Sequence, residues 1–318
     1  MTFDARRLPT VLTAEELIEK AFRRASKVTG RNRREKALNK LSTMSNVLRD
    51  YFTRIITSHP SYDNLDDFYR EMVDIVVGLR RIKKSLAALS WADSMTQRVI
   101  TQGIRRIKGG RDPERTLKEV YGRVASIIEQ IDDELRFLNE AKMRLREIPS
   151  LTNDFTVVFA GYPNVGKSSI ISRISTVKPE VASYPFTTKK IFVGYLDSPA
   201  GRIQVIDTPG LLDRPFEKRN KIERRAVLAL RHLADVVVFV IDPTESCGFE
   251  LEKQLSLLEE VREEFDLPVI EIYSKADLHS FRDRRAVSVV TGEGIEELVD
   301  TIKSLAEQKS GEKSGNGE

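Results

Sequence analysis

Apolar residues recur every three or four positions through the first half of the chain, which is the spacing of one buried helix face. Between residues 33 and 59 they fall at Leu38, Leu41, Val47, Leu48, Tyr51, Phe52 and Ile55. Asp112-Pro113 joins an N-cap residue to a first-turn proline and predicts a long helix that continues to Leu138. We therefore predict a bundle of four or five antiparallel helices over residues 1–150.

Beyond residue 150, short and almost unbroken apolar runs replace that spacing. They are FTVVFA, KIFVGYL, RIQVID, DVVVFVID and LPVIEIY, and helical patterns separate them. This alternation is typical of βαβ units, so we predict an α/β domain over residues 151–308, with a mainly parallel sheet and helices on both faces. Residues 309–318 have almost nothing apolar to bury, and we predict a disordered tail.

The net charge divides between the same two halves. The chain of 318 residues carries +4 in total, but residues 1–150 carry +9 and residues 151–318 carry −5. A basic helical domain suggests contact with a polyanion. The single cysteine, Cys247, excludes an internal disulfide, and no apolar run is long enough to span a membrane. We expect a cytoplasmic protein with no membrane span.

Basic residues are densest between Lys20 and Lys40, where nine Lys and Arg residues accompany one acidic residue. Such a run is either a solvated helix face or a surface that contacts the phosphates of nucleic acid. Few aromatic residues interleave with these charges, so base stacking is not indicated. The candidates for RNA binding are Arg31, Arg33, Arg34 and Lys36, with Arg80 and Arg81 as an extension of the patch.

The sequence GYPNVGKS, from Gly161 to Ser168, matches the phosphate-loop pattern G-x-x-x-x-G-K-[ST]. It lies between a predicted buried strand and a predicted helix, where backbone N–H groups and the helix dipole favour an anion. We expect Lys167 to reach the outer phosphates of a nucleotide and Ser168 to ligate magnesium. The nucleotide-binding candidates here are Tyr162, Pro163, Asn164, Val165, Gly166, Lys167, Ser168 and Ser169.

Two further motifs follow the phosphate loop in the order expected of a nucleotide switch. Asp207 ends the predicted strand RIQVID and can hold magnesium through water, and the N–H of Gly210 can reach the terminal phosphate. Thr188, in YPFTTKK, can offer its hydroxyl to magnesium. The predicted metal ligands are therefore Ser168, Thr188 and Asp207.

The base is predicted from Ser274-Lys275-Ala276-Asp277, directly after a predicted strand. The carboxylate of Asp277 can accept hydrogen bonds from the ring N–H and the amino group of guanine, whereas adenine presents the opposite polarity. The stem of Lys275 can lie over the base. Ser288, Val289 and Val290 can offer a backbone N–H to the guanine oxygen. Asp277 therefore argues against a kinase or an ATPase.

These five motifs resemble those of the translation-factor class of small GTPases, and GYPNVGKS with YPFTT is similar to the Obg-type branch. Together with the basic bundle, the chain resembles the archaeal and nucleolar GTP-binding proteins that act in large-ribosomal-subunit assembly. The resemblance implies binding of GTP and GDP, slow hydrolysis with Mg²⁺, two conformations, and docking on pre-ribosomal RNA or a pre-ribosomal particle. The sequence departs from the usual motifs at Ser274, where Asn or Thr is usual, and at Val289, where Ala is usual.

The residue after Gly210 bears on the mechanism. Ras-like switches place a glutamine there to orient the attacking water, whereas this chain has Leu211, so unaided turnover should be slow. Asn164 either holds K⁺ near the phosphates, as in resembling GTPases, or only stabilises its loop. The other candidate for completing the catalytic site is an activating partner. The predicted catalytic residues are Lys167, Thr188, Gly210 and Asn164. The alternative function is a signalling or membrane-associated GTPase whose bundle binds a protein or acidic lipid.

Overall fold

The computed structural model describes most of the chain, in two compact units. It covers residues 4–152, 154–176, 180–182, 184–185, 190–278 and 285–315. Among these, the first unit contains residues 4–65 and 76–146, and the second contains residues 66–75 and 147–315. A short segment from the first half of the sequence therefore groups with the second half.

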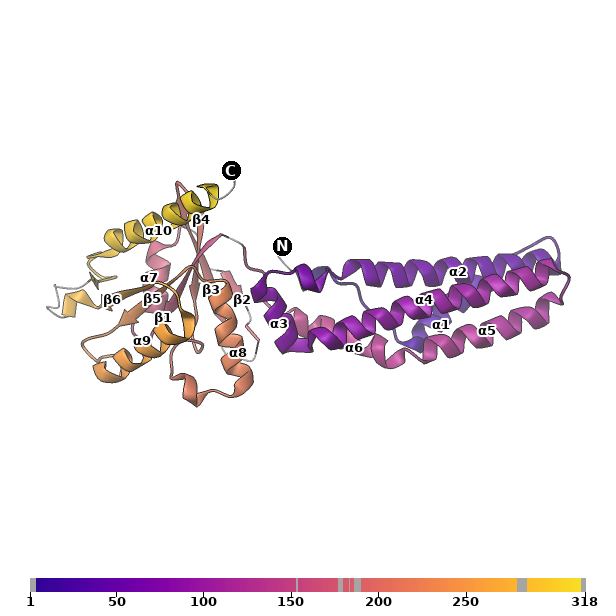
Figure 1. Cartoon of the computed structure of the whole chain (residues 1–318), viewed down its shortest axis with the longest axis horizontal. Helices are drawn as coiled ribbons and strands as arrows, with labels where there is room; N and C mark the ends of the chain where they lie inside the picture. The colour runs from indigo at the N-terminus through magenta and orange to yellow at the C-terminus, as the bar shows by residue number, and fades with distance from the viewer. Residues whose placement is uncertain are drawn as a thin grey trace. The chain divides into compact units, whose positions relative to one another are not determined.

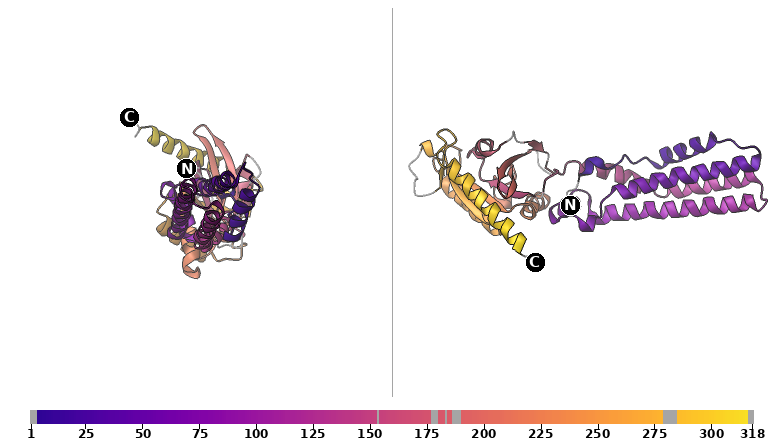
Figure 2. Two further views of the ribbon diagram at one scale, coloured as in Figure 1. Left: turned by 90° about the vertical axis from the view of Figure 1, so that its right-hand side faces the viewer. Right: turned by 90° about the horizontal axis from the view of Figure 1, so that it is seen from above.

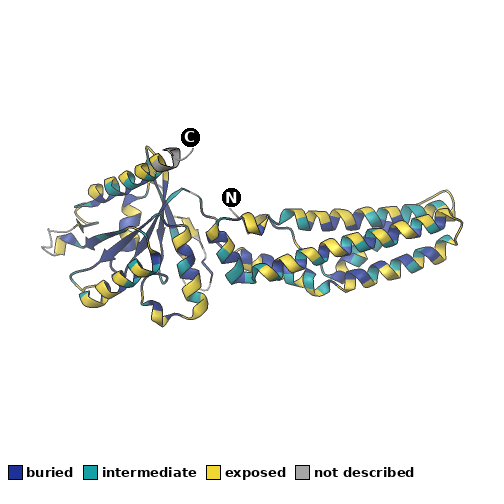
Figure 3. Cartoon of the chain, in the orientation of Figure 1, coloured by how far each residue is buried: buried dark blue, intermediate teal, exposed yellow. Residues whose placement is uncertain are grey.

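The first unit is a bundle of long helices joined by short turns, which confirms the predicted helical fold. Its helices are α1 (Ala14–Ser26), α2 (Arg33–Ser58), α4 (Leu79–Lys108), α5 (Pro113–Glu129) and α6 (Asp132–Leu145). They run side by side in the views of Figures 1 and 2. Each turns a buried stripe inward and an exposed stripe to solvent, as Figure 3 shows. The fully buried side chains include Leu41, Met44, Leu48, Ile55, Ile82 and Leu89.

The predicted helix from Asp112 to Leu138 is wrong in one respect, because it divides into two. Asp112 caps α5 through the N–H of Arg115, with Pro113 in the first turn, and α5 then ends at Glu129. A new helix starts at Asp132, whose carboxylate accepts hydrogen bonds from the N–H of Ala14 at 2.8 Å and from Arg136 at 2.6 Å. The contact between Asp132 and Ala14, far apart in sequence, stabilises the start of α6 at this position. The apolar spacing alone could not predict such a contact.

Helix α3 (Asp67–Val77) contributes residues 66–75 to the second unit. The hydroxyl of Tyr69 donates to the carbonyl oxygen of Leu151 at 2.8 Å and accepts from the N–H of Leu151 at 2.7 Å. Arg225 pairs with Glu71 at 3.8 Å and with Asp74 at 3.2 Å. One face of α3 is thus held by buried packing and by ion pairs to residues more than 80 positions away.

The second unit is built on a seven-stranded sheet of order β2-β3-β4-β1-β5-β6-β7, which confirms the predicted, mainly parallel α/β fold. The neighbouring strands β4, β1, β5, β6 and β7 pair in parallel, whereas β3 pairs antiparallel with both β4 and β2. Their bounds are β1 (Phe155–Ala160), β2 (Glu180–Ala182), β3 (Ile191–Ser198), β4 (Gly201–Asp207), β5 (Val236–Ile241), β6 (Val269–Ser274) and β7 (Ala286–Val287).

Helices cover both faces of this sheet (Figure 1). They are α7 (Lys167–Ile174), α8 (Lys221–Ala229), α9 (Leu251–Phe265) and α10 (Ile295–Gly315). The predicted tail differs from the structure, because α10 extends through residues 309–315. Lys309 pairs with Asp235, and this contact favours continuation of the helix. None of the helices within the described ranges has the length and apolar character needed to cross a membrane.

Candidate functional site

The candidate site lies where the parallel strands end. The phosphate loop follows β1, Asp207 ends β4, Asp242 follows β5, Ser274 ends β6 and Ser288 follows β7. Because these strands are parallel neighbours, the residues that follow them meet at one edge of the sheet. The sheet order therefore gathers motifs that are separated by more than 120 residues in sequence.

Two glycines give the phosphate loop its path. Gly161 has φ of 129°, and a Cβ there would lie 2.4 Å from the carbonyl oxygen of Val240 in β5. Gly166 has φ of 103° at the start of α7. Between them Val165 is fully buried, and Asn164 adopts φ of 62°, a conformation that asparagine tolerates better than most residues. The loop thus needs glycine at both positions that the motif fixes.

Lys167, Ser168 and Asp207 converge beside this loop. The ammonium of Lys167, 6% exposed, donates to the carbonyl oxygens of Gly161 at 2.6 Å and Tyr162 at 2.7 Å. The hydroxyl of Ser168 donates to Oδ2 of Asp207. Burial raises the pKa of Asp207, against the opposing effects of the Ser168 hydrogen bond and the Lys167 charge.

The other carboxylate oxygen of Asp207, Oδ1, is buried and has no hydrogen-bond partner among the described residues. A buried, unsatisfied carboxylate oxygen is costly, and a hydrated cation would satisfy it. The residues present therefore fit the predicted Mg²⁺. Thr188, the third predicted ligand, lies outside the described residues. A pocket of about 390 Å³ opens here, lined by Pro163, Asn164, Gly166, Lys167, Ser168, Ser169, Asp207, Pro209 and Asp213.

Gly210 follows Pro209, which lines this pocket, and belongs to a tightly bonded turn. Its N–H donates to Oδ2 of Asp213 at 2.7 Å. Leu211 and Leu212 are each 1% exposed, and the carbonyl oxygen of Leu212 accepts the N–H of Gly161 at 2.9 Å. The two leucines are therefore part of the core, and neither side chain has a polar group that could orient water.

The guanine-recognition candidates lie together at the ends of β6 and β7. Asp277 is exposed, and its carboxylate accepts a hydrogen bond of 2.5 Å from the hydroxyl of Ser288. The N–H of Ser288 donates to Glu293, and that of Val290 donates to the hydroxyl of Ser288. The N–H of Val289 makes no hydrogen bond within the described part of the chain, so it is the one available to a ligand.

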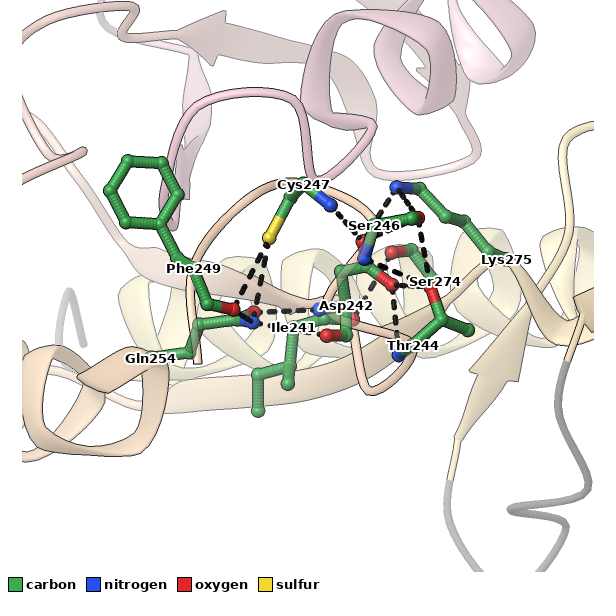
Figure 4. A network of polar contacts seen from close by, with 9 residues as sticks. All are labelled: Ile241, Asp242, Thr244, Ser246, Cys247, Phe249, Gln254, Ser274 and Lys275. Carbon is green, nitrogen blue, oxygen red and sulfur yellow. Dashed lines mark hydrogen bonds and ion pairs between the residues drawn. The ribbon is translucent and has the colours of Figure 1, made fainter. Parts of the chain in front are cut away.

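Asp242 is a residue of this site that the sequence interpretation missed. Its carboxylate accepts hydrogen bonds from the ammonium of Lys275 at 2.6 Å, from Thr244 and from the N–H of Cys247, as Figure 4 shows. Burial favours the neutral acid, but the bonds from Lys275 and Thr244 outweigh it and lower the pKa of Asp242. Its position directly after the apolar strand VVVFVI was the signal that could have identified it.

Four arginines near the segment after Gly210 differ in their partners. Arg214 pairs with Glu223 at 3.5 Å, Arg224 pairs with Glu264, and Arg225 pairs with residues of α3. Arg219 is only 9% exposed and donates to the carbonyl oxygens of Gly210 at 3.4 Å and Arg214 at 3.0 Å. Its Nε has no hydrogen-bond partner in the portion of the chain that is described.

The RNA-binding candidates do not form one patch. Arg31, Arg33, Arg34 and Lys36 are exposed at the end of the bundle where α1 meets α2 and α4 meets α5. Arg34 donates to the carbonyl oxygen of Lys108 at 2.7 Å, which places Arg105, Arg106 and Lys108 nearby. Arg80 and Arg81 begin α4, roughly 40 Å along the helix axis from Arg106. Arg81 stacks on Phe137 and pairs with Glu134 at 3.9 Å.

Comparison with known proteins shows which family the chain belongs to. Residues 5–152 match the NOG1 N-terminal helical domain, and residues 221–277 match the family Nucleolar GTP-binding protein 1 (NOG1). An uncharacterized protein of Methanocaldococcus jannaschii is 40% identical over 86% of this chain and 81% of its own length. The chain belongs to the NOG1 family.

Members of the NOG1 family from eukaryotes are longer. Nucleolar GTP-binding protein 1 of Saccharomyces cerevisiae is 31% identical over 85% of this chain, but the match covers only 44% of the yeast protein. A crystal structure of nucleolar GTP-binding protein 1 from Plasmodium falciparum is 31% identical over 52% of this chain and 93% of that chain, with a TM-score of 0.46. The chain thus spans less than half the length of its yeast relative.

Proposed function

We propose that the protein is a GTP-binding, slowly GTP-hydrolysing switch that acts in large-ribosomal-subunit assembly by binding pre-ribosomal RNA. The observation that carries the nucleotide part is the convergence of Lys167, Ser168 and Asp207 on one pocket, with Asp277 at the end of β6. The names of the relatives, which include GTP binding and the nucleolus, support the same proposal.

In this proposal Lys167 exchanges its carbonyl partners for the outer phosphates, because an ammonium gains more from an anion than from two neutral acceptors. Ser168 and Asp207, together with Thr188, would hold Mg²⁺, which when bound neutralises charge on the phosphates. The backbone N–H groups of Asn164–Ser168 would hold the phosphate oxygens. Gly210 donates its N–H to the terminal phosphate.

Guanine is recognised by the residues that follow β6 and β7. The hydroxyl of Ser288 occupies one oxygen of Asp277 and so orients the carboxylate. The carboxylate then accepts from the ring N–H and amino group of guanine, and the N–H of Val289 donates to the guanine oxygen. Asp242 anchors the ammonium of Lys275, which leaves the aliphatic stem of Lys275 to cover the base.

Hydrolysis is slow in this proposal because the buried side chain of Leu211 cannot orient water. We expect an unaided rate on the order of that of Ras, about 10⁻⁴ per second, or below. The amide of Asn164 lines the phosphate pocket and makes no hydrogen bond with any described residue. It is therefore available to hold K⁺, whose charge would assist the reaction, and an activating partner would supply the rest.

RNA binding is assigned to the exposed basic end of the bundle. The residues Arg31, Arg33, Arg34 and Lys36 extend from it, and Arg105, Arg106 and Lys108 lie beside them. Clustered Lys and Arg residues bind phosphates through the release of counterions, so affinity should fall steeply with salt. Arg80 and Arg81 lie roughly 40 Å away along α4, outside this basic end, and the proposal does not depend on them.

The test is filter binding of large-subunit ribosomal RNA at several salt concentrations. We expect a triple variant with Arg31, Arg33 and Arg34 changed to Gln to lose at least tenfold in affinity and to show a shallower salt slope. A matched double variant, Arg80→Gln with Arg81→Gln, should bind like wild type. Equal loss in both variants, or tighter binding to acidic vesicles than to RNA, would contradict the proposal.

A further inference from the structure

The N–H of Gly210 is occupied by a charged acceptor from the protein itself. Oδ2 of Asp213 accepts this N–H at 2.7 Å, and Asp213 is only 6% exposed. Hydrogen bonds to ionised acceptors are about twice as strong as neutral ones. Asp213 also lines the pocket that contains Lys167 and Ser168. A negative side chain therefore stands where the proposed function requires a phosphate.

One N–H cannot serve both acceptors. If the proposed function holds, the third phosphate of GTP needs the hydrogen that Asp213 now accepts, and like charges at this separation repel. GDP has no third phosphate and makes no such demand. We infer that Asp213 is a specificity-determining residue, which competes with the third phosphate for Gly210 and so sets the preference of the site between GDP and GTP.

A second pocket beside the first could receive the carboxylate of Asp213 when a phosphate displaces it. This pocket of about 760 Å³ adjoins the first, since Pro163 and Asp213 line both. Its wall includes Lys218 and Arg219. The guanidinium of Arg219 makes no ion pair with any described carboxylate and keeps its buried Nε unsatisfied. A carboxylate that leaves Gly210 can pair with Arg219, so Arg219 stabilises the GTP form.

The two residues contact the two backbone polar groups of Gly210. Asp213 holds the N–H of Gly210, while Arg219 donates to its carbonyl oxygen at 3.4 Å. Gly210 has φ of 80°, a backbone conformation that glycine adopts more easily than any other residue. Removal of Asp213 should therefore favour GTP, and removal of Arg219 should disfavour it. Opposite signs from two neighbouring variants are not expected of a merely structural role.

The experiment measures dissociation constants for fluorescent GDP and a non-hydrolysable GTP analogue, with Mg²⁺, on the full chain. In Asp213→Ala we expect analogue affinity to rise about tenfold and GDP affinity to stay within twofold. In Arg219→Gln we expect the analogue to weaken severalfold, with Arg219→Lys closer to wild type. Glu252→Gln removes an exposed acidic charge from α9 and should change neither constant.

The outcomes separate this inference from the proposed function. If both nucleotides bind and Asp213→Ala leaves their affinity ratio unchanged, or weakens the analogue, Asp213 does not compete and the inference is wrong. If wild type binds neither nucleotide, the proposed function itself fails. Should Asp213→Ala lose GDP binding through misfolding, Asp213→Asn decides. It keeps the shape of the side chain without its charge and should raise analogue affinity at least threefold.

Discussion

The phenol of Tyr184 donates a hydrogen bond of 2.6 Å to the carbonyl oxygen of Ala226, 42 residues away. Its oxygen also lies 3.7 Å from the sulfur of Met72 in α3. All three residues are buried. The contact joins α3 to α8 and to the segment that leads toward Thr188. Tyr184 therefore ties α3 and α8 together within the second unit.

We predict that Tyr184→Phe destabilises the protein by about 1–2 kcal/mol, because the carbonyl of Ala226 loses a buried donor while the ring still packs. Urea denaturation of the full chain measures the change. Tyr195→Phe is the matched control, since the hydroxyl of Tyr195 has no hydrogen bond to any described residue and its ring is half-buried. An equal loss in both variants would show that the Tyr184 contact contributes nothing specific.

Magnesium should matter to nucleotide affinity through Asp207. We predict that chelation with EDTA weakens GTP binding to wild type at least tenfold, and that Asp207→Asn shows little further response to EDTA. The reason is that the buried Oδ1 of Asp207 has no partner in the described structure and is available to metal-bound water. Asp154→Asn, a carboxylate paired with Arg202 away from the pocket, should respond to EDTA like wild type. Retention of a full response in Asp207→Asn would contradict the metal assignment.

Stability should fall at mildly acidic pH because of His59. Burial lowers the pKa of His59 to about 4 from its ordinary value of 6.5, and Nδ1 lies 2.7 Å from the hydroxyl of Tyr62. His59 therefore binds a proton below about pH 6.5 in the unfolded chain but only below about pH 4 in the folded chain. Between pH 7 and pH 5 this linkage removes about 2 kcal/mol of unfolding free energy. His59→Gln should lose correspondingly less over that range, and identical losses would exclude His59 as the cause.

The nucleotide motifs and the division into a bundle and an α/β fold could be predicted because each depends on local patterns. In GYPNVGKS, for example, Gly161 and Gly166 both have positive φ angles within the loop itself, which favour glycine. The docking of α3 could not be predicted, because it depends on Tyr69 meeting Leu151, 82 residues later. Asp213 was missed for a similar reason: only the folded turn shows which N–H its carboxylate meets. The break before Asp132 likewise follows from a contact with Ala14.

Potassium should accelerate GTP turnover if Asn164 holds the ion. We predict severalfold faster hydrolysis in KCl than in NaCl at the same ionic strength, and loss of that difference in Asn164→Ala. GDP affinity of the variant should stay near that of wild type, because the backbone of the loop holds the phosphates. Equal rates in the two salts would remove Asn164 from the mechanism and leave the missing charge to a partner.

Calorimetric titration with GTP and with ATP, both with Mg²⁺, tests the central claim most directly. The site described here should bind GTP at least 100-fold more tightly than ATP, and Asp277→Asn should abolish that preference, because its amide presents a donor where guanine needs an acceptor. Equal affinity for the two nucleotides, or no heat with either, would contradict a guanine-nucleotide switch at this edge of the sheet.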